Sequence, residues 1–202
     1  AEVVLIGRLD AALRRLNPEF PEEAISDAVR RIANYSGTSL IESNRELYHW
    51  IRDGVPVDVE IDGRTQRRKA QVVHWTDPTQ NDWLVVNQYT VRGKKTDRPD
   101  LVVFLNGLPV SVIELKNPAD ETADVYKALN QIKNYQAEIG QLFEPSVVNV
   151  ISDGTVARVG SITADGERYM PWRVADGIDD PSKHLELEVM VRGVFEKQTF
   201  LT

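Results

Sequence analysis

The chain has 202 residues, a formal net charge of −7 and no cysteine. This length is sufficient for one globular domain with a substantial hydrophobic core. The absence of cysteine excludes disulfide frameworks, thiolate zinc sites and a cysteine nucleophile, and it fits a reducing compartment. The acidic charge argues against a protein that simply coats DNA, because Lys and Arg make the contacts to phosphate.

Membrane association is not expected from this sequence. Apolar runs such as Leu101–Leu105 are far shorter than the roughly 20 residues that a membrane-spanning helix needs. The chain also has no signal-peptide pattern at its start. These features predict a cytoplasmic protein with no membrane partner.

Hydrophobic periodicity and turn residues predict secondary structure along the chain. In chain order we expect helices over about 21–35 and 41–53, strands over about 55–61, 68–75 and 83–91, a hairpin over 100–116, a helix over about 120–139, and strands over 145–151 and 155–161. Residues 174–190 are predicted to form an acidic surface excursion before a final helical segment that ends at Thr202. The expected fold is α/β, with a mixed β-sheet flanked by helices.

The predicted hairpin carries the main candidate site. Two apolar strands surround Asn106-Gly107, a dipeptide that strongly favours a hairpin turn. Because strand side chains alternate between the two faces, Glu114 and Lys116 project on one side while Leu115 points into the core. The E-x-K spacing therefore places a carboxylate and an ammonium group on the same face of the sheet.

Whether Asp100 joins these two side chains depends on the strand register. A strict two-residue loop at Asn106-Gly107 pairs Leu105 with Leu108, and counting back sets Asp100 opposite Ile113, on the wrong face. The pairing must shift by one residue for Asp100 to meet Glu114, through a three-residue loop or a bulge. Pro109 cannot donate to the ladder, which favours such an irregularity near the turn. We predict this shift as a condition of function.

One Asp and one Glu without nearby Cys or His suit a hard cation better than zinc. We expect Mg²⁺, with Mn²⁺ as a substitute, and expect Lys116 to steady an attacking hydroxide or the developing negative charge. Surface strands also carry alternating Glu and Lys for solubility alone, so the spacing by itself has an ordinary structural explanation. A glycosidase-like pair at Asp100 and Glu114 is a further alternative, although Lys116 fits phosphate better than sugar.

Flanking motifs favour the nuclease interpretation over these alternatives. The motifs are Asn17–Ala24, Asn44–Tyr48, Asn87–Val91, Arg98-Pro99-Asp100, Asn106–Pro109, Val112–Pro118 and Gln131–Tyr135. Over about residues 15–160 the chain resembles the N-terminal nuclease domain of type I restriction enzyme R (HsdR) subunits, whose restriction-endonuclease-like fold has a PD-(D/E)xK core. The resemblance places Asp100, Glu114 and Lys116 on the catalytic positions. It implies a type I site-specific deoxyribonuclease that hydrolyses duplex DNA with Mg²⁺, held by the two carboxylates and the Leu115 backbone carbonyl.

Further site residues follow from the same resemblance. The family's Q-x-x-x-Y motif falls on Gln131 and Tyr135, four residues apart on one face of the predicted helix, where we expect them to contact DNA or brace Lys116. A border pair with a half-buried Tyr and a solvated Gln is the alternative. A carboxylate from the first helix often completes the metal shell in this superfamily, and we favour Glu23 over Glu22, although capping of the helix dipole alone explains both acids.

Two basic clusters compensate locally for the acidic net charge. The first consists of Arg64, Arg67, Arg68 and Lys69, and the second of Arg92, Lys94, Lys95 and Arg98. The second cluster directly precedes the strand that begins at Asp100, so we expect it to contact DNA. The alternative is an ordinary solvated turn.

The chain has no G-x-x-x-x-G-K-[ST] phosphate loop, which an ATP-driven motor requires. R subunits of the family that the chain resembles continue into an ATP-driven DNA translocase. The resemblance therefore implies one nuclease domain over 1–202, with a core over about 15–160 and an extension over 161–202 that leads to a motor domain outside this chain. ATP would then act only in the full-length enzyme, and the modification (methyltransferase) and specificity subunits would choose the DNA target. The alternatives are a stand-alone nuclease of the repair or resolvase type and a non-catalytic module that docks DNA or subunits.

Overall fold

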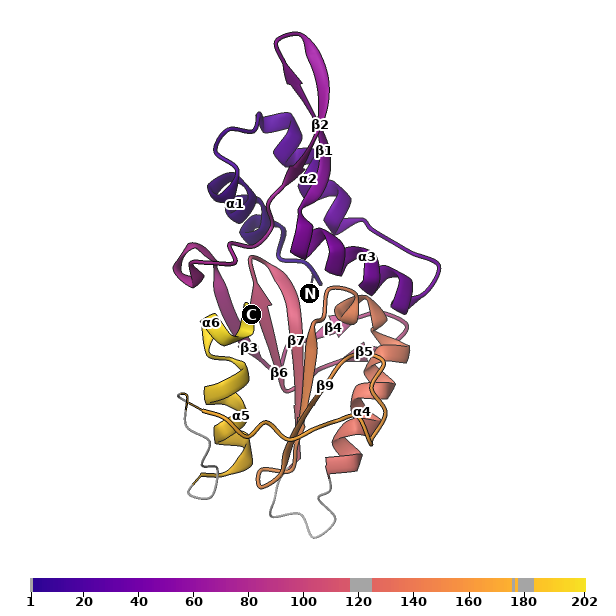
Figure 1. The fold of residues 1–202 in the computed structure, drawn as a ribbon. Helices are drawn as coiled ribbons and strands as arrows, with labels where there is room; N and C mark the ends of the chain where they lie inside the picture. Colours follow the sequence, from indigo (N-terminus) through magenta and orange to yellow (C-terminus); the bar gives the residue numbers. More distant parts are fainter. Residues whose placement is uncertain (1, 117–124, 176, 178–183) are drawn as a thin grey trace.

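The structure is a computed structural model that describes residues 2–116, 125–175, 177 and 184–202. It is built around a central β-sheet with helices on both faces and a helical cap at one end (Figure 1). Its helices are α1 (Ile6–Leu16), α2 (Glu22–Ala33), α3 (Leu40–Asp53), α4 (Val125–Glu138), α5 (Glu186–Val194) and α6 (Lys197–Phe200), with 3₁₀ turns η1 (Pro78–Gln80) and η2 (Gly140–Phe143). Its strands are β1 (Val55–Ile61), β2 (Arg64–Ala70), β3 (Trp83–Asn87), β4 (Val91–Arg92), β5 (Thr96–Asp97), β6 (Leu101–Leu105), β7 (Leu108–Leu115), β8 (Val148–Ser152) and β9 (Ala157–Gly160).

The central sheet has the strand order β3-β6-β7-β8-β9. β7 and β8 run parallel, whereas the other neighbouring pairs in this sheet run antiparallel. A parallel pair needs a crossover connection, and α4 lies in the segment that links β7 to β8. The predicted mixed β-sheet with flanking helices is thereby confirmed.

Alternation along the central strands divides the core into two layers. Val102 and Phe104 of β6 pack with α4, in a cluster that also contains Ile132 of that helix. Val103 of β6 faces the opposite side and belongs to the cluster that contains Met190 of α5. The sheet is therefore buried on both faces, which explains the nearly continuous apolar sequences of β6 and β7.

A cap formed by α1, α2, α3 and the β1–β2 ribbon covers the sheet end at which the β6–β7 hairpin turns (Figure 1). At this turn the backbone N–H of Leu5 donates to the carbonyl of Gly107 over 2.9 Å. A Cβ at Gly107, where φ is +83°, would lie 2.6 Å from the Leu5 carbonyl oxygen, so only glycine fits there. The opposite end of the hairpin, with Asp100, points away from the cap.

The predicted helices over 21–35 and 41–53 are confirmed as α2 and α3, within two residues at each end. Helix α1 was not predicted, although Leu9, Ala12 and Leu13 are completely buried in it. Within the described residues the predicted helix over 120–139 is confirmed as α4, while its expected start at Asp120 lies outside them. None of the described helices has the length and apolar character needed to cross a bilayer.

The strand predicted over 68–75 is wrong at both ends, because β2 runs from Arg64 to Ala70 and pairs along its whole length with β1. Every residue of β2 before Ala70 is exposed. The strand therefore lacks the alternation of apolar and polar residues from which its two ends could be predicted. The strand predicted over 83–91 is also wrong in part, since β3 ends at Asn87. Gln88 has a φ of +53°, which breaks the extended conformation.

Asn106 joins the hairpin turn to the loop between β2 and β3. Its side-chain nitrogen donates to the carbonyl of Val72 and to Oδ1 of Asn81, both over 2.8 Å, and its Oδ1 accepts from the backbone N–H of Asp82 over 2.7 Å. The residue is fully buried, and its φ of +50° is one that Asn tolerates.

We predict that Asn106→Ala lowers the free energy of unfolding by about 3 kcal/mol. The substitution leaves buried polar groups without a hydrogen-bond partner, and each such group destabilises the fold by about 1–3 kcal/mol. Urea denaturation measures this change. Asn134→Ala on the exposed side of α4 is the control and should stay within about 0.5 kcal/mol of wild type. Equal stability of the two variants would contradict a structural role for the Asn106 contacts.

Candidate active site

The register of the β6–β7 hairpin contains the predicted one-residue shift. Leu105 pairs with Leu108 across the Asn106-Gly107 turn, but Val103 pairs with Ser111 and Leu101 with Ile113. The irregularity falls between Val103 and Phe104 and leaves one extra residue in β7 next to Pro109. The prediction of a bulge near Pro109 is therefore confirmed, and continuing the shifted register by one residue brings Asp100 level with Glu114.

Asp100 lies just before β6, and hydrogen bonds from two directions hold its carboxylate. The Gln88 side-chain nitrogen donates to Oδ1 over 2.8 Å, and the backbone N–H of Leu115 donates to Oδ2 over 2.8 Å. The backbone N–H of Gln88 also donates to the Asp100 carbonyl over 2.8 Å. Among the described residues each carboxylate oxygen therefore has one donor, and it keeps further lone pairs for another ligand.

Glu114 is the buried acid of the site, with a relative exposure of 4%. Its Oε1 accepts from Nζ of Lys116 over 2.7 Å, whereas Oε2 is buried and has no hydrogen-bond partner among the described residues. Burial raises the pKa of Glu114, the hydrogen bond from Lys116 opposes that rise, and the negative charge of Asp100 adds to it. The Tyr135 hydroxyl also favours the charged form of the carboxyl group.

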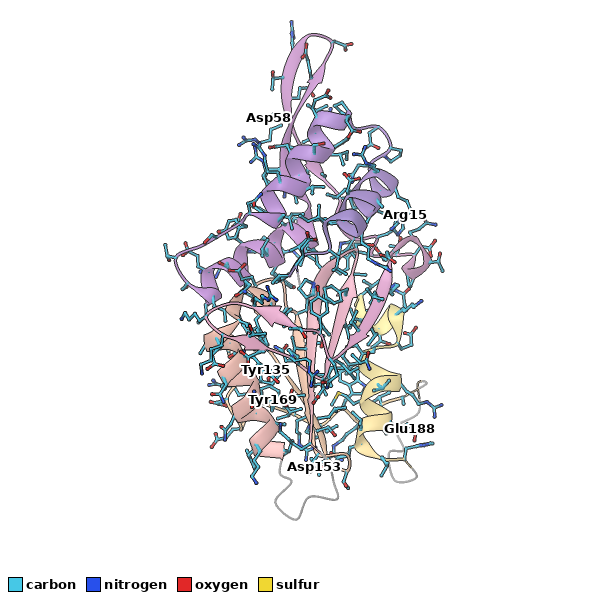
Figure 2. The ribbon with its side chains drawn as sticks, turned by 180° about the vertical axis from the view of Figure 1, so that it is seen from behind. Arg15, Asp58, Tyr135, Asp153, Tyr169 and Glu188 are labelled. Atoms are coloured by element: carbon cyan, nitrogen blue, oxygen red, sulfur yellow. The ribbon has the colours of Figure 1, made fainter. Side chains whose placement is uncertain are left out.

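The Q-x-x-x-Y pair approaches this acid from α4. Tyr135 is buried on the α4 side of the sheet (Figure 2), which corrects the alternative of a half-buried border residue. Burial and the adjacent Glu114 charge raise the pKa of Tyr135, and the Gln131 side chain partly offsets this. A tyrosine that stays protonated is able to donate a hydrogen bond to a neighbouring carboxylate. That Gln131 and Tyr135 contact DNA or brace Lys116 stays a prediction.

Asp100, Glu114 and the Leu115 backbone carbonyl form a set of hard oxygen atoms that fits a divalent cation such as Mg²⁺ or Mn²⁺. The observation that carries this fit is the buried Oε2 of Glu114, since an uncompensated carboxylate oxygen in a low-dielectric site favours a bound cation. The described residues contain no group of three or more His, Cys, Asp or Glu side chains able to hold a metal. Water would therefore complete the shell, as is usual for Mg²⁺.

The structure does not bring Glu23 to this site, which corrects the expectation from sequence. α2 packs against α1 and β1 in the cap, and the hairpin places Asp100 at the opposite end of the sheet. Glu23 is exposed in the first turn of α2, and its neighbour Glu22 forms an ion pair with Arg14. Both acids are explained by their position at a helix N-terminus.

The second basic cluster lies around the β4–β5 hairpin, which packs against the end of α4. The Lys94 backbone N–H donates to the Glu138 carbonyl over 2.8 Å, and the Lys95 side chain forms an ion pair with Glu138. Arg92, Lys94 and Arg98 are exposed and have no ion pair within the described parts of the chain. The first cluster lies instead on β2, in the ribbon that projects from the cap (Figure 1).

Gln88 is the site contact that sequence reasoning missed. It belongs to the Asn87–Val91 motif, but no role was assigned to it because the predicted strand over 83–91 ran through this position, whereas β3 ends at Asn87. Its positive φ, which turns it towards Asp100, has no clear signal in a non-glycine residue.

We predict that Glu114→Gln stabilises the metal-free protein at pH 7. A raised pKa means that the folded state binds the Glu114 proton more tightly than the unfolded state does. Protonation of Glu114 therefore stabilises the fold fully below about pH 4.5, and this stabilisation is lost as the pH rises through the folded pKa. Gln cannot ionise, so the variant does not lose this stabilisation at pH 7. The difference in free energy of unfolding between the variant and wild type should therefore shrink as the pH is lowered. Denaturant unfolding in EDTA between pH 4 and 8 measures the difference.

Glu138→Gln is the control with the opposite sign, because the Lys95 hydrogen bond lowers the pKa of Glu138. Its carboxylate stabilises the fold above the unfolded pKa, and this contribution is lost as pH falls. A Glu114→Gln protein that is less stable than wild type at pH 7 would contradict the proposed cost of burying the Glu114 charge.

The comparisons agree with the resemblance found in the sequence. The family model described as "Type I restriction enzyme R protein N terminus" matches residues 1–168. Over 98% of its length the chain is 35% identical to the type I restriction enzyme HindI endonuclease subunit of Haemophilus influenzae, of which it covers 19%. It is 26% identical over 98% of its length to the putative type I restriction enzyme MjaIXP endonuclease subunit of Methanocaldococcus jannaschii, of which it covers 21%.

This chain thus spans about a fifth of the length of these two relatives. The family match extends beyond the range 15–160 that the sequence motifs covered, and it includes α1. The mixed sheet flanked by helices is consistent with a restriction-endonuclease-like fold. The chain belongs to the family of type I restriction enzyme R protein N-terminal regions.

Proposed function

We propose that this chain is the endonuclease domain of a type I restriction R subunit, which hydrolyses phosphodiester bonds of duplex DNA with Mg²⁺. The observation that carries the proposal is the convergence of Asp100, Glu114 and Lys116 on one face of the sheet, through the register shift in the β6–β7 hairpin. The names of the relatives, which are endonuclease subunits, support the same activity.

In this mechanism Asp100, Glu114 and the Leu115 carbonyl would hold the cation. When bound, Mg²⁺ supplies Lewis acidity towards the scissile phosphate and its nucleophilic water. Lys116 has a side-chain exposure of 29%, so its ammonium group can reach both Glu114 and an approaching phosphate. It orients the attacking water and neutralises the charge that develops on the phosphate oxygens. Tyr135 favours the charged form of the Glu114 carboxyl group that the cation requires.

Arg92, Lys94 and Arg98 contact the phosphate backbone of the duplex in this proposal, because their exposed charges precede Asp100 in the chain. The net charge of −7 limits the affinity of the chain alone for DNA. Target choice therefore rests with modification and specificity subunits, and ATP-driven translocation with a motor domain of the full-length enzyme. A non-catalytic docking module is the competing function, and the acidic net charge is the observation in its favour.

We predict that Asp100→Ala and Lys116→Ala abolish DNA cleavage by the assembled restriction enzyme, while ATP hydrolysis and subunit assembly persist. Loss of a metal ligand or of charge stabilisation at the reacting phosphate costs at least about 100-fold in rate. Linearisation of a plasmid that carries the target site measures cleavage. Omission of Mg²⁺ should also abolish cleavage, but it stops ATP hydrolysis as well. Glu138→Gln serves as a matched carboxylate control that keeps wild-type cleavage. Full cleavage by either alanine variant would favour the docking module.

We also predict that Lys94→Ala combined with Arg98→Ala weakens DNA binding by this chain in a salt-dependent way. Each lost phosphate contact should reduce the slope of log affinity against log salt by about one unit. Fluorescence anisotropy with a labelled duplex at several salt concentrations measures the slope. Lys197→Ala on α6 is the control, and an unchanged slope in the double variant would remove these residues from the DNA interface.

A further inference from the structure

Gln88 has an unusual combination of backbone conformation, exposure and contacts. It follows the last residue of β3 and has a φ of +53°, which a non-glycine residue adopts at a cost on the order of 1–3 kcal/mol. The residue is exposed, so burial of its side chain does not account for this strain. What the conformation does achieve is a double contact with Asp100, from the backbone N–H to the carbonyl and from the side chain to Oδ1.

Asp100 needs such support because it precedes β6 and is not itself part of the strand. Its Oδ2 accepts from the Leu115 backbone N–H, which alone would leave the carboxylate free to rotate about that single bond. The Gln88 side-chain nitrogen, at 2.8 Å from Oδ1, supplies the second point of attachment. Two donors on different oxygens fix the plane of the carboxylate and leave a lone pair on each oxygen available.

We propose that Gln88 is a positioning residue that sets the orientation of the Asp100 carboxylate for the divalent cation. This inference rests on the proposed metal-dependent function. Gln88 does not itself contact the cation or the substrate. Gln88 holds the Asp100 carboxylate, which is the metal ligand, in a fixed orientation. Removal of such a hydrogen-bond partner commonly weakens metal affinity by about 10–100-fold. The strained backbone is retained because no extended residue at this position could direct both donors at Asp100.

The test compares Gln88→Met and Gln88→Gly with wild type. Methionine keeps the length of the side chain but removes the donor, and glycine removes the side chain while accepting the positive φ without strain. Gln66→Met, on the exposed ribbon strand β2, is the matched control. Mn²⁺ binding to this 202-residue chain is followed by calorimetry, and cleavage by the assembled enzyme is followed as a function of Mg²⁺ concentration.

Both Gln88 variants should raise the Mn²⁺ dissociation constant, and the Mg²⁺ concentration for half-maximal cleavage, by about 10-fold or more. The cleavage rate at saturating Mg²⁺ should stay within about threefold of wild type, because the cation restores the ligand orientation once it is bound. Gln88→Gly should unfold at no lower temperature than wild type. A purely structural role would instead lower stability and leave the metal dependence unchanged.

The outcomes separate this inference from the proposed function. Wild-type metal affinity in both Gln88 variants, alongside loss of binding in Asp100→Ala, would overturn the positioning role and leave the nuclease proposal intact. Absence of Mn²⁺ binding in the wild-type chain would overturn both. Weakened binding in Gln88→Met but not in Gln66→Met supports both.

Discussion

One unpaired residue in β7, between the Asn106-Gly107 turn and Ser111, turns Asp100 from one face of the sheet to the other. Strand side chains have a period of two, so a shift of one residue exchanges every facing pair beyond it. With the shift, Asp100 shares a face with Glu114 and Lys116, on the side covered by α4. Without it, the same residues would be divided between the two hydrophobic layers, and Asp100 would meet the cluster that contains Ile113.

The bulge places a charged carboxylate where the fold disfavours one. Glu114 lies on the mostly apolar central strand β7, and its burial raises the pKa of the carboxyl group. Lys116 and Tyr135 offset part of this cost, and one buried oxygen remains without a donor within the described residues. A site of this kind is poised to gain stability when a cation binds, since binding to the folded state alone contributes about 2.7 kcal/mol at 100 times the dissociation constant.

Much of this arrangement could be predicted from local patterns. Two apolar runs predicted the hairpin strands, Asn106-Gly107 predicted their turn, and the need for Asp100 to meet Glu114 predicted the register shift. Helix α1 escaped prediction because its cap residue Leu5 makes no side-chain capping bond, so no start signal was present. Its burial depends on tertiary contact with the hairpin turn, which a local pattern does not contain.

The site residues show the same limit. Gln131 and Tyr135 could be placed together on one helix face because a spacing of four residues fixes a common face, whereas their assignment to the site came from the family resemblance. Glu23 was wrongly assigned to the site because tertiary packing, which a local pattern does not contain, places α2 in the helical cap away from Asp100. Gln88 was missed because its backbone leaves the regular strand conformation, and only the three-dimensional structure shows where its side chain then points.

The proposed nuclease depends on Asp100 and Glu114 together holding a divalent cation. Calorimetric titration of Mn²⁺ into this chain, compared with the Asp100→Ala variant, is the sharpest test. We expect saturable binding to the wild-type chain that is lost in the variant, with both proteins equally folded by circular dichroism. Identical titrations of the two proteins would contradict it, because Asp100 would then be no part of a metal site.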